Sequence, residues 1–82
     1  MKTLEQIDKE VSTCAKNLRI KNPADGDFEL RVNPGWKKEF EQSLPKKKSG
    51  IVSIDTRVGV VMIKIDRRVT QKKGYYIRYV GV

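Results

Sequence analysis

The sequence predicts a single α+β domain, in which two short helices pack on one face of a four-stranded, mostly antiparallel sheet. Three observations lead to this prediction. Two segments carry apolar residues at helical spacing, a five-residue segment between them alternates apolar and polar residues, and the second half of the chain is rich in valine and isoleucine. The 82 residues have the length of one domain, 1–82, with a small core. The expected order of elements is helix, strand, helix, strand, strand, strand. The first strand, the second helix and the next strand form either a parallel right-handed crossover or an arrangement in which the helix caps one edge of the sheet.

The first helix is expected over residues 3–20. Its apolar stripe recurs every three or four residues and consists of Leu4, Ile7, Val11, Cys14 and Leu18. The proline and glycine of "KNPADGD" then end the helix. The lone cysteine belongs to this stripe, so we interpret it as a core residue and not as a reactive thiol.

The strict alternation of "FELRV", residues 28–32, predicts a half-buried strand. A second helix is expected over residues 33–44. Asn33 is a favourable N-cap, Pro34 suits the first helical position, and Trp36, Phe40 and Leu44 repeat every four residues.

Three more strands are expected in residues 50–55, 58–69 and 74–82. The middle one is apolar on both faces, which favours a central place in the sheet. The connections "DTRVG" and "VTQKKG" have the length of hairpin loops. In the last strand, period two places Tyr76 and Arg78 on the face opposite Tyr75, Ile77 and Tyr79. If Ile77 faces the helices, Tyr76 and Arg78 lie on the open face.

The charge is distributed unevenly along the chain. Residues 1–41 hold eight basic and eight acidic side chains, whereas residues 42–82 hold ten basic and two acidic ones. The whole net charge of +8 therefore belongs to the second half. Such asymmetry indicates a polyanionic partner.

The candidate binding residues are the cations of this second half together with the tyrosine on its open face. They are Lys46, Lys47, Lys48, Arg57, Lys64, Arg67, Arg68, Lys72, Lys73, Tyr76 and Arg78. Tyrosine beside arginine suits base stacking and phosphate contact, and it suits a protein-binding hot spot equally well.

The sequence lacks the residues of common catalytic and metal sites. It has no histidine and one cysteine, so we expect no metal, no cofactor and no enzymatic activity. A hairpin could bring Asp55 and Asp66 together, although ion pairs with the neighbouring cations explain these carboxylates better. The minor alternative is a ribonuclease without histidine, built on Arg, Lys, Tyr and Glu.

We therefore expect a small, cytoplasmic, non-enzymatic protein that binds DNA or RNA through strands and loops and does not associate with membranes. The alternative is an accessory protein of the phage or mobile-element type, which docks on an acidic patch of a host protein and inhibits it. A homodimer through the closing "YVGV" edge is a further expectation, because this segment is apolar and terminal.

Overall fold

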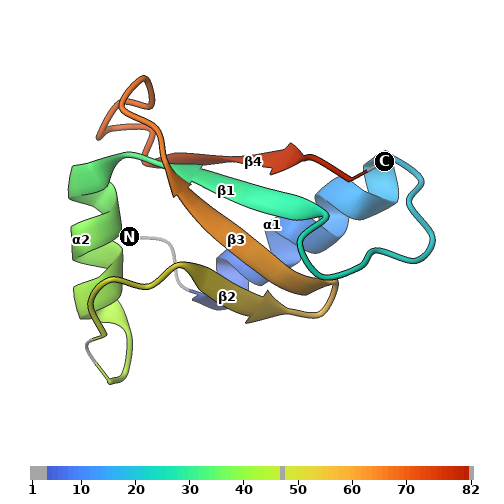
Figure 1. Cartoon of the computed structure of the whole chain (residues 1–82), viewed down its shortest axis with the longest axis horizontal. Helices are drawn as coiled ribbons and strands as arrows, with labels where there is room; N and C mark the ends of the chain where they lie inside the picture. Colours follow the sequence, from blue (N-terminus) through green and yellow to red (C-terminus); the bar gives the residue numbers. More distant parts are fainter. Residues whose placement is uncertain (1–3, 47, 82) are drawn as a thin grey trace.

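The computed structural model describes residues 4–46 and 48–81. Two helices and four strands follow one another in the expected order, which confirms the predicted α+β class (Figure 1). The elements are α1 (Leu4–Asn17), β1 (Phe28–Val32), α2 (Pro34–Ser43), β2 (Ser53–Thr56), β3 (Gly59–Ile65) and β4 (Tyr75–Tyr79). The strands form one sheet in the order β2-β3-β1-β4.

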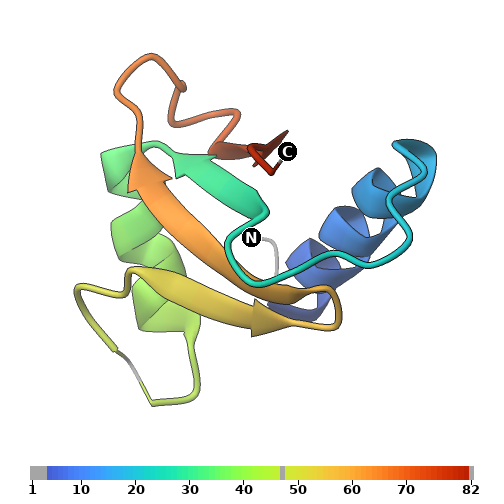
Figure 2. The same cartoon turned by 45° about the vertical axis from the view of Figure 1, so that its right-hand side comes forward.

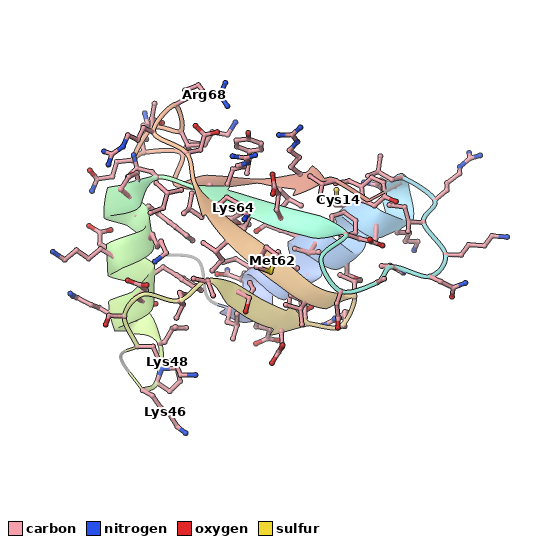
Figure 3. The ribbon with its side chains drawn as sticks, viewed as in Figure 1. Cys14, Lys46, Lys48, Met62, Lys64 and Arg68 are labelled. Atoms are coloured by element: carbon pink, nitrogen blue, oxygen red, sulfur yellow. The ribbon has the colours of Figure 1, made fainter. Side chains whose placement is uncertain are left out.

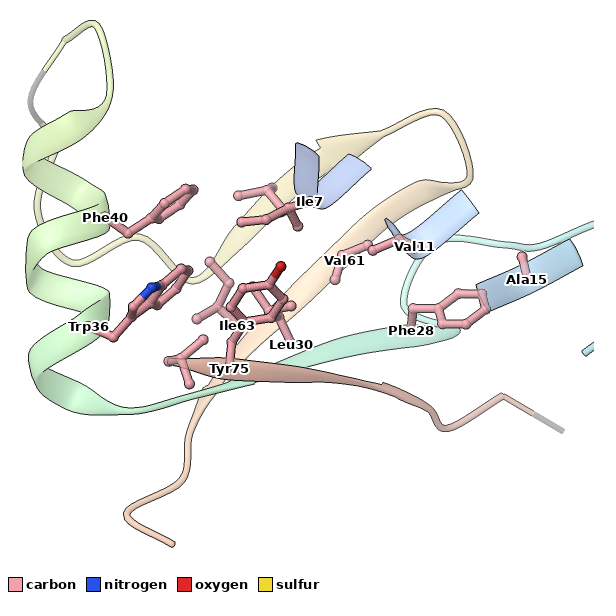
Figure 4. Close-up of a cluster of buried hydrophobic side chains, with 12 residues drawn as sticks. Ile7, Val11, Ala15, Phe28, Leu30, Trp36, Phe40, Val61, Ile63 and Tyr75 are labelled. Carbon is pink, nitrogen blue, oxygen red and sulfur yellow. The ribbon is translucent and has the colours of Figure 1, made fainter. Parts of the chain in front are cut away.

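Both helices lie on the same side of this sheet. Figure 1 shows the sheet in front of α1, and Figure 2 shows it in front of α2; neither helix covers the face of the sheet that is turned toward the reader. The two helices share one core with the strands, as the close-up in Figure 4 shows. Its innermost side chains, each less than 2% exposed, are Ile7, Val11, Phe28, Leu30, Val32, Phe40 and Val61. The core is thus one-sided, and the other face of the sheet can carry polar residues.

The pairing of the strands differs from the expected succession of hairpins. β2 and β3 do form an antiparallel hairpin, but β3 and β4 are not neighbours. β1 lies between them, parallel to β3 and antiparallel to β4. The prediction of a hairpin at "VTQKKG" is therefore wrong. The physical reason is burial. Every second residue of β1 is inaccessible to solvent, and a strand inside the sheet has its backbone groups paired on both edges, so β1 takes an inner position between β3 and β4.

The first helix is shorter than its apolar pattern predicts. It ends at Asn17, and Arg19 follows with a φ of 59° in the left-handed region. As a consequence, Leu18 is 52% exposed and Ala15 takes its expected place in the core. Cys14 is half-buried and packs against the core, as expected for a structural residue.

The second helix begins as predicted. The Asn33 side-chain oxygen accepts a hydrogen bond from the Trp36 backbone N–H at 3.1 Å, and Pro34 occupies the first turn. The Asn33 amide also donates to the carbonyl of Val69 at 2.8 Å. This second bond ties the start of α2 to the connection between β3 and β4.

Candidate binding surface

The order of the strands builds a row of three polar side chains across the uncovered face of the sheet, which we call the open face. Lys64 on β3 pairs in register with Arg31 on β1, and Arg31 pairs with Tyr76 on β4. Adjacent strands are about 4.8 Å apart, so the row spans about 10 Å between its outer backbones. Figure 3 shows Lys64 and Met62 in front of the sheet, on the side away from the helices.

A second row on the open face holds a buried carboxylate between Met62 and Arg78. Glu29 is only 7% exposed and accepts a 2.7 Å hydrogen bond from Arg31 Nε. Its Oε1 also lies 3.9 Å from Arg78 Nη1. A carboxylate at this depth requires cationic partners, and in return it holds both guanidinium groups on this face.

A second buried carboxylate lies where β3 ends. Asp66 accepts hydrogen bonds from the Arg68 backbone N–H at 2.9 Å and from Nε and Nη2 of the same arginine, each at 3.2 Å. The Tyr76 hydroxyl donates to Asp66 Oδ2 at 3.3 Å. The Arg68 hydrogen bonds hold the pKa of Asp66 below its ordinary value, so the carboxylate stays ionised and positions both partners.

The connection 66–74, which we call the basic loop, brings further cations beside Tyr76. Lys73 Nζ lies 5.6 Å from the centroid of the Tyr76 ring, within range of a cation–π interaction. A shallow hollow of about 360 Å³ between the loop and the ring is lined by Asp66, Arg68, Val69, Thr70, Lys73 and Tyr76. Arg67 and Lys72 are exposed on the same loop.

Hydrogen bonds within the basic loop and to Asn33 hold this loop in place. The Gly74 N–H donates to the Thr70 carbonyl at 2.8 Å, and the Asn33 N–H donates to the Gly74 carbonyl at 2.8 Å. Val69 is 5% exposed, so the loop is anchored on the protein by an apolar side chain as well. Its cations are therefore presented from an ordered backbone.

The open face and the basic loop together form one cationic surface, which we call the open-face cluster. Its members are Arg31, Lys64, Arg67, Arg68, Lys72, Lys73, Tyr76 and Arg78. The surface thus combines seven positive side chains and one tyrosine with the two carboxylates of Glu29 and Asp66. The surface is strongly cationic, and its tyrosine lies at the edge strand, beside Arg68 and Lys73 of the basic loop.

Two of the predicted lysines lie elsewhere. Lys46 and Lys48 follow α2 at the end opposite to the basic loop, and Figure 3 shows them well separated from Arg68. The ten-residue helix, about 15 Å long, separates Lys46 from the start of α2, whereas Lys48 lines a hollow along the helix that Pro34 and Ile65 also line. The segment is attached through Glu41, which accepts hydrogen bonds from Lys37 Nζ at 2.7 Å and from the Ile51 N–H at 2.8 Å. Lys47 lies outside the described residues.

Arg57 is also apart from the cluster. It occupies the turn between β2 and β3, where its backbone N–H donates to Asp8 Oδ1 at 2.9 Å and its Nε lies 3.3 Å from Asp8 Oδ2. Asp8 belongs to α1, so this arginine is directed to the helical layer. This contact attaches the β2–β3 hairpin to α1, and Arg57 is therefore not a member of the open-face cluster.

The hairpin does not bring Asp55 and Asp66 together. Asp55 is opposite Val60 near the turn, whereas Asp66 follows the far end of β3. Six residues of extended chain separate Val60 from Asp66, which corresponds to about 20 Å. Among the described residues, no group of three or more Cys, Asp or Glu side chains could hold a metal ion.

Sequence reasoning missed Arg31. The first half of the chain has no net charge, so none of its cations was considered as a binding residue, although the fold places one of its arginines in the open-face cluster. The alternation of "FELRV" did place Arg31 on the polar side of its strand. Only the insertion of β1 between β3 and β4 made it the centre of the row.

Comparisons with protein families, with curated proteins and with solved structures give no match for this chain. In the part of the chain that the structure describes, no helix has the length and apolar character needed to span a membrane. The function must therefore be inferred from the surface itself.

Proposed function

We propose that this protein binds single-stranded nucleic acid, without catalysing a reaction, on the open-face cluster. Tyr76 stacks on an unpaired base, and the cations around it contact the phosphates on either side. The observation that supports this most strongly is the row Lys64–Arg31–Tyr76, which joins three strands on the face that no helix covers. A positively charged groove or face with an aromatic platform is the general arrangement for binding single strands.

The geometry favours a single strand over a duplex. Stacking on Tyr76 requires a base whose face is free, and a paired base in a helix offers no such face. Reading a duplex would instead require an element that enters a groove, as a recognition helix does. Both helices of this protein contribute side chains to the core on the opposite side of the sheet.

The buried carboxylates prepare the cluster for binding. Glu29 accepts a hydrogen bond from Arg31 and attracts Arg78 at 3.9 Å, while Asp66 accepts hydrogen bonds from Arg68 and from the Tyr76 hydroxyl. Side chains that are already oriented lose less conformational entropy when a ligand binds. If about five cations meet phosphates, the logarithm of the affinity should fall with the logarithm of the salt concentration at a slope of about −3.5 on single strands.

The experiment is fluorescence anisotropy with labelled single- and double-stranded DNA and RNA over a range of salt concentrations. The test variant is Lys64→Glu/Lys73→Glu, and the control is Lys16→Glu/Lys21→Glu, which changes the net charge equally on exposed positions of α1 and the segment after it. We expect the test variant to lose at least about tenfold in affinity and to show a shallower salt slope. Equal losses in both variants would reduce the effect to net charge and contradict the proposed site.

A second pair of variants examines stacking separately from charge. Tyr76→Phe keeps the ring and removes only the hydrogen bond to Asp66, so its affinity should remain close to that of the native protein. Tyr76→Leu removes the platform and should cost about 1–3 kcal/mol of binding free energy. If Tyr76→Leu binds as well as Tyr76→Phe, no base stacks there.

An acidic protein surface is the second candidate partner. The observation in its favour is the same cluster, because a tyrosine between arginines that are already held in place is typical of protein hot spots. Labelled polyglutamate distinguishes the two candidates. If it binds as tightly as the single strand at equal salt, the acidic protein is favoured.

A further inference from the structure

The strand at one edge of the sheet, β4, has no neighbouring strand on its outer side among residues 4–46 and 48–81. The Val80 N–H donates to the Asp27 carbonyl and the Asn33 N–H donates to the Gly74 carbonyl, each at 2.8 Å. Backbone groups of an antiparallel strand point alternately to either side. Tyr76 and Arg78 therefore bond to β1, whereas the N–H and C=O groups of the three residues Tyr75, Ile77 and Tyr79 point away from the sheet.

The sequence of β4 complements itself when it is read in the opposite direction. An antiparallel copy centred on Ile77 would place Ile77 opposite Ile77, Tyr75 opposite Tyr79 and Tyr76 opposite Arg78. The first two pairs lie on the helical side of the sheet, and the third lies on the open face. Aromatic pairs and tyrosine–arginine pairs across strands are both favourable.

From this match we propose that the protein forms a two-fold symmetric dimer by pairing β4 with β4 of a second copy. The pairing satisfies the outward backbone groups of both strands and joins two four-stranded sheets into one of eight strands. A two-fold axis requires a surface that is its own partner, and the order of residues in β4 meets this requirement on both faces.

The surface beside β4 supports a second copy as its partner. A hollow of about 470 Å³ between β4 and α1 is lined by Lys9, Glu10, Thr13, Cys14, Asn17, Leu18 and Ile77. Leu18, one of the residues that line this hollow, is 52% exposed. The hollow combines apolar side chains with charges of both signs, so two copies can face each other without an excess of either charge.

The opposite edge of the sheet is less suited to such pairing. β2 has only four residues and carries Asp55, whose side chain is exposed. Short edge strands and charged side chains discourage edge-to-edge contact. β2 therefore provides a matched control within the same molecule.

The first experiment is sedimentation of the protein alone, without nucleic acid, so that its result does not depend on the proposed function. We expect the native chain to sediment with twice the mass of one copy. Ile77→Lys places two like charges against each other on the axis and should shift the protein to the monomer. Ser53→Lys adds the same charge on β2 and should leave the dimer unchanged. A monomer at every concentration up to the millimolar range, or a dimer that Ser53→Lys disrupts and Ile77→Lys does not, would overturn the proposal.

The second experiment keeps the test independent of the folding of Ile77→Lys. A hydrogen-bonded pair of antiparallel residues has Cα atoms about 5.5 Å apart, which lies in the range of a disulfide. In a Cys14→Ser background, Ile77→Cys should therefore form an intermolecular disulfide on mild oxidation at least about tenfold faster than Ser53→Cys, because only position 77 is held against its copy at a high effective concentration. Equal rates at the two positions would exclude pairing through β4.

Discussion

Gly74 joins the basic loop to β4, and replacing it with alanine should destabilise the protein strongly. Its φ of +82° lies in the left-handed region, which side chains with a Cβ rarely adopt. A Cβ built at this position would lie 2.6 Å from Trp36 Cδ1 and 2.7 Å from Trp36 Nε1. The Trp36 ring cannot move aside easily, because it stacks on Phe40 at 5.1 Å between centroids and contacts Tyr75 at 4.9 Å.

The size of the effect follows from two separate costs. The left-handed backbone costs an alanine about 1–2 kcal/mol. Overpacking against the ring adds about 1–3 kcal/mol. The total of about 2–5 kcal/mol is a large part of the free energy of unfolding that a domain of this size has, since whole domains have about 5–15 kcal/mol.

Gly26 supplies the control for the backbone term. Its φ is +83°, nearly equal to that of Gly74, but a Cβ there would meet nothing within 4 Å. Gly26→Ala should therefore show the backbone cost alone. Urea unfolding monitored by the fluorescence of Trp36 gives the free energy of unfolding of each variant. If Gly74→Ala and Gly26→Ala are equally unstable, the contact with Trp36 does not constrain the chain and the reasoning is refuted.

Two further predictions concern the anchors of the two loops. The hydrogen bond from Lys37 holds the pKa of Glu41 below its ordinary value near 4.5, so this carboxylate stabilises the fold above that pH, and its contribution is lost as the pH falls through the lowered pKa. Glu41→Gln should therefore reduce the loss of unfolding free energy that the native protein shows on acidification. A pH profile of the unfolding free energy that is the same in both proteins would contradict this prediction. Asn33→Ala removes the cap of α2 and the bond to Val69, and it should cost about 1–2 kcal/mol in urea unfolding. A loss below experimental error would show that neither bond matters.

Much of the fold could be predicted from local patterns. The alternation of "FELRV" gave the bounds of β1, and Asn33 with Pro34 gave the start of α2, because both signals depend on the geometry of a few neighbouring residues. The apolar residues on both faces of residues 58–69 correctly indicated a central strand. The end of the first helix was predicted less well, because the apolar stripe continues to Leu18 after the helix has ended.

The arrangement of the binding residues was only partly predictable. Period two placed Tyr76 and Arg78 on one face of their strand, and this face is the open one because Ile77 packs against the core. Their neighbours could not be predicted in this way, because a hairpin between β3 and β4 would have placed Lys64 directly beside them. The separation of Lys46 and Lys48 from the cluster depends on the direction and length of α2, which no local pattern contains.

The sequence by itself determined the elements, their order, the excess of positive charge in the second half and the side of each strand on which that charge lies. These properties depend on periodicity and composition, which act over a few residues. The tertiary structure alone decided which strands are neighbours. The position of β1 between β3 and β4 depends on contacts between residues that are far apart in the sequence, which bury the apolar side of β1. This position places Arg31, from the neutral half of the chain, between Lys64 and Tyr76 on the cationic surface.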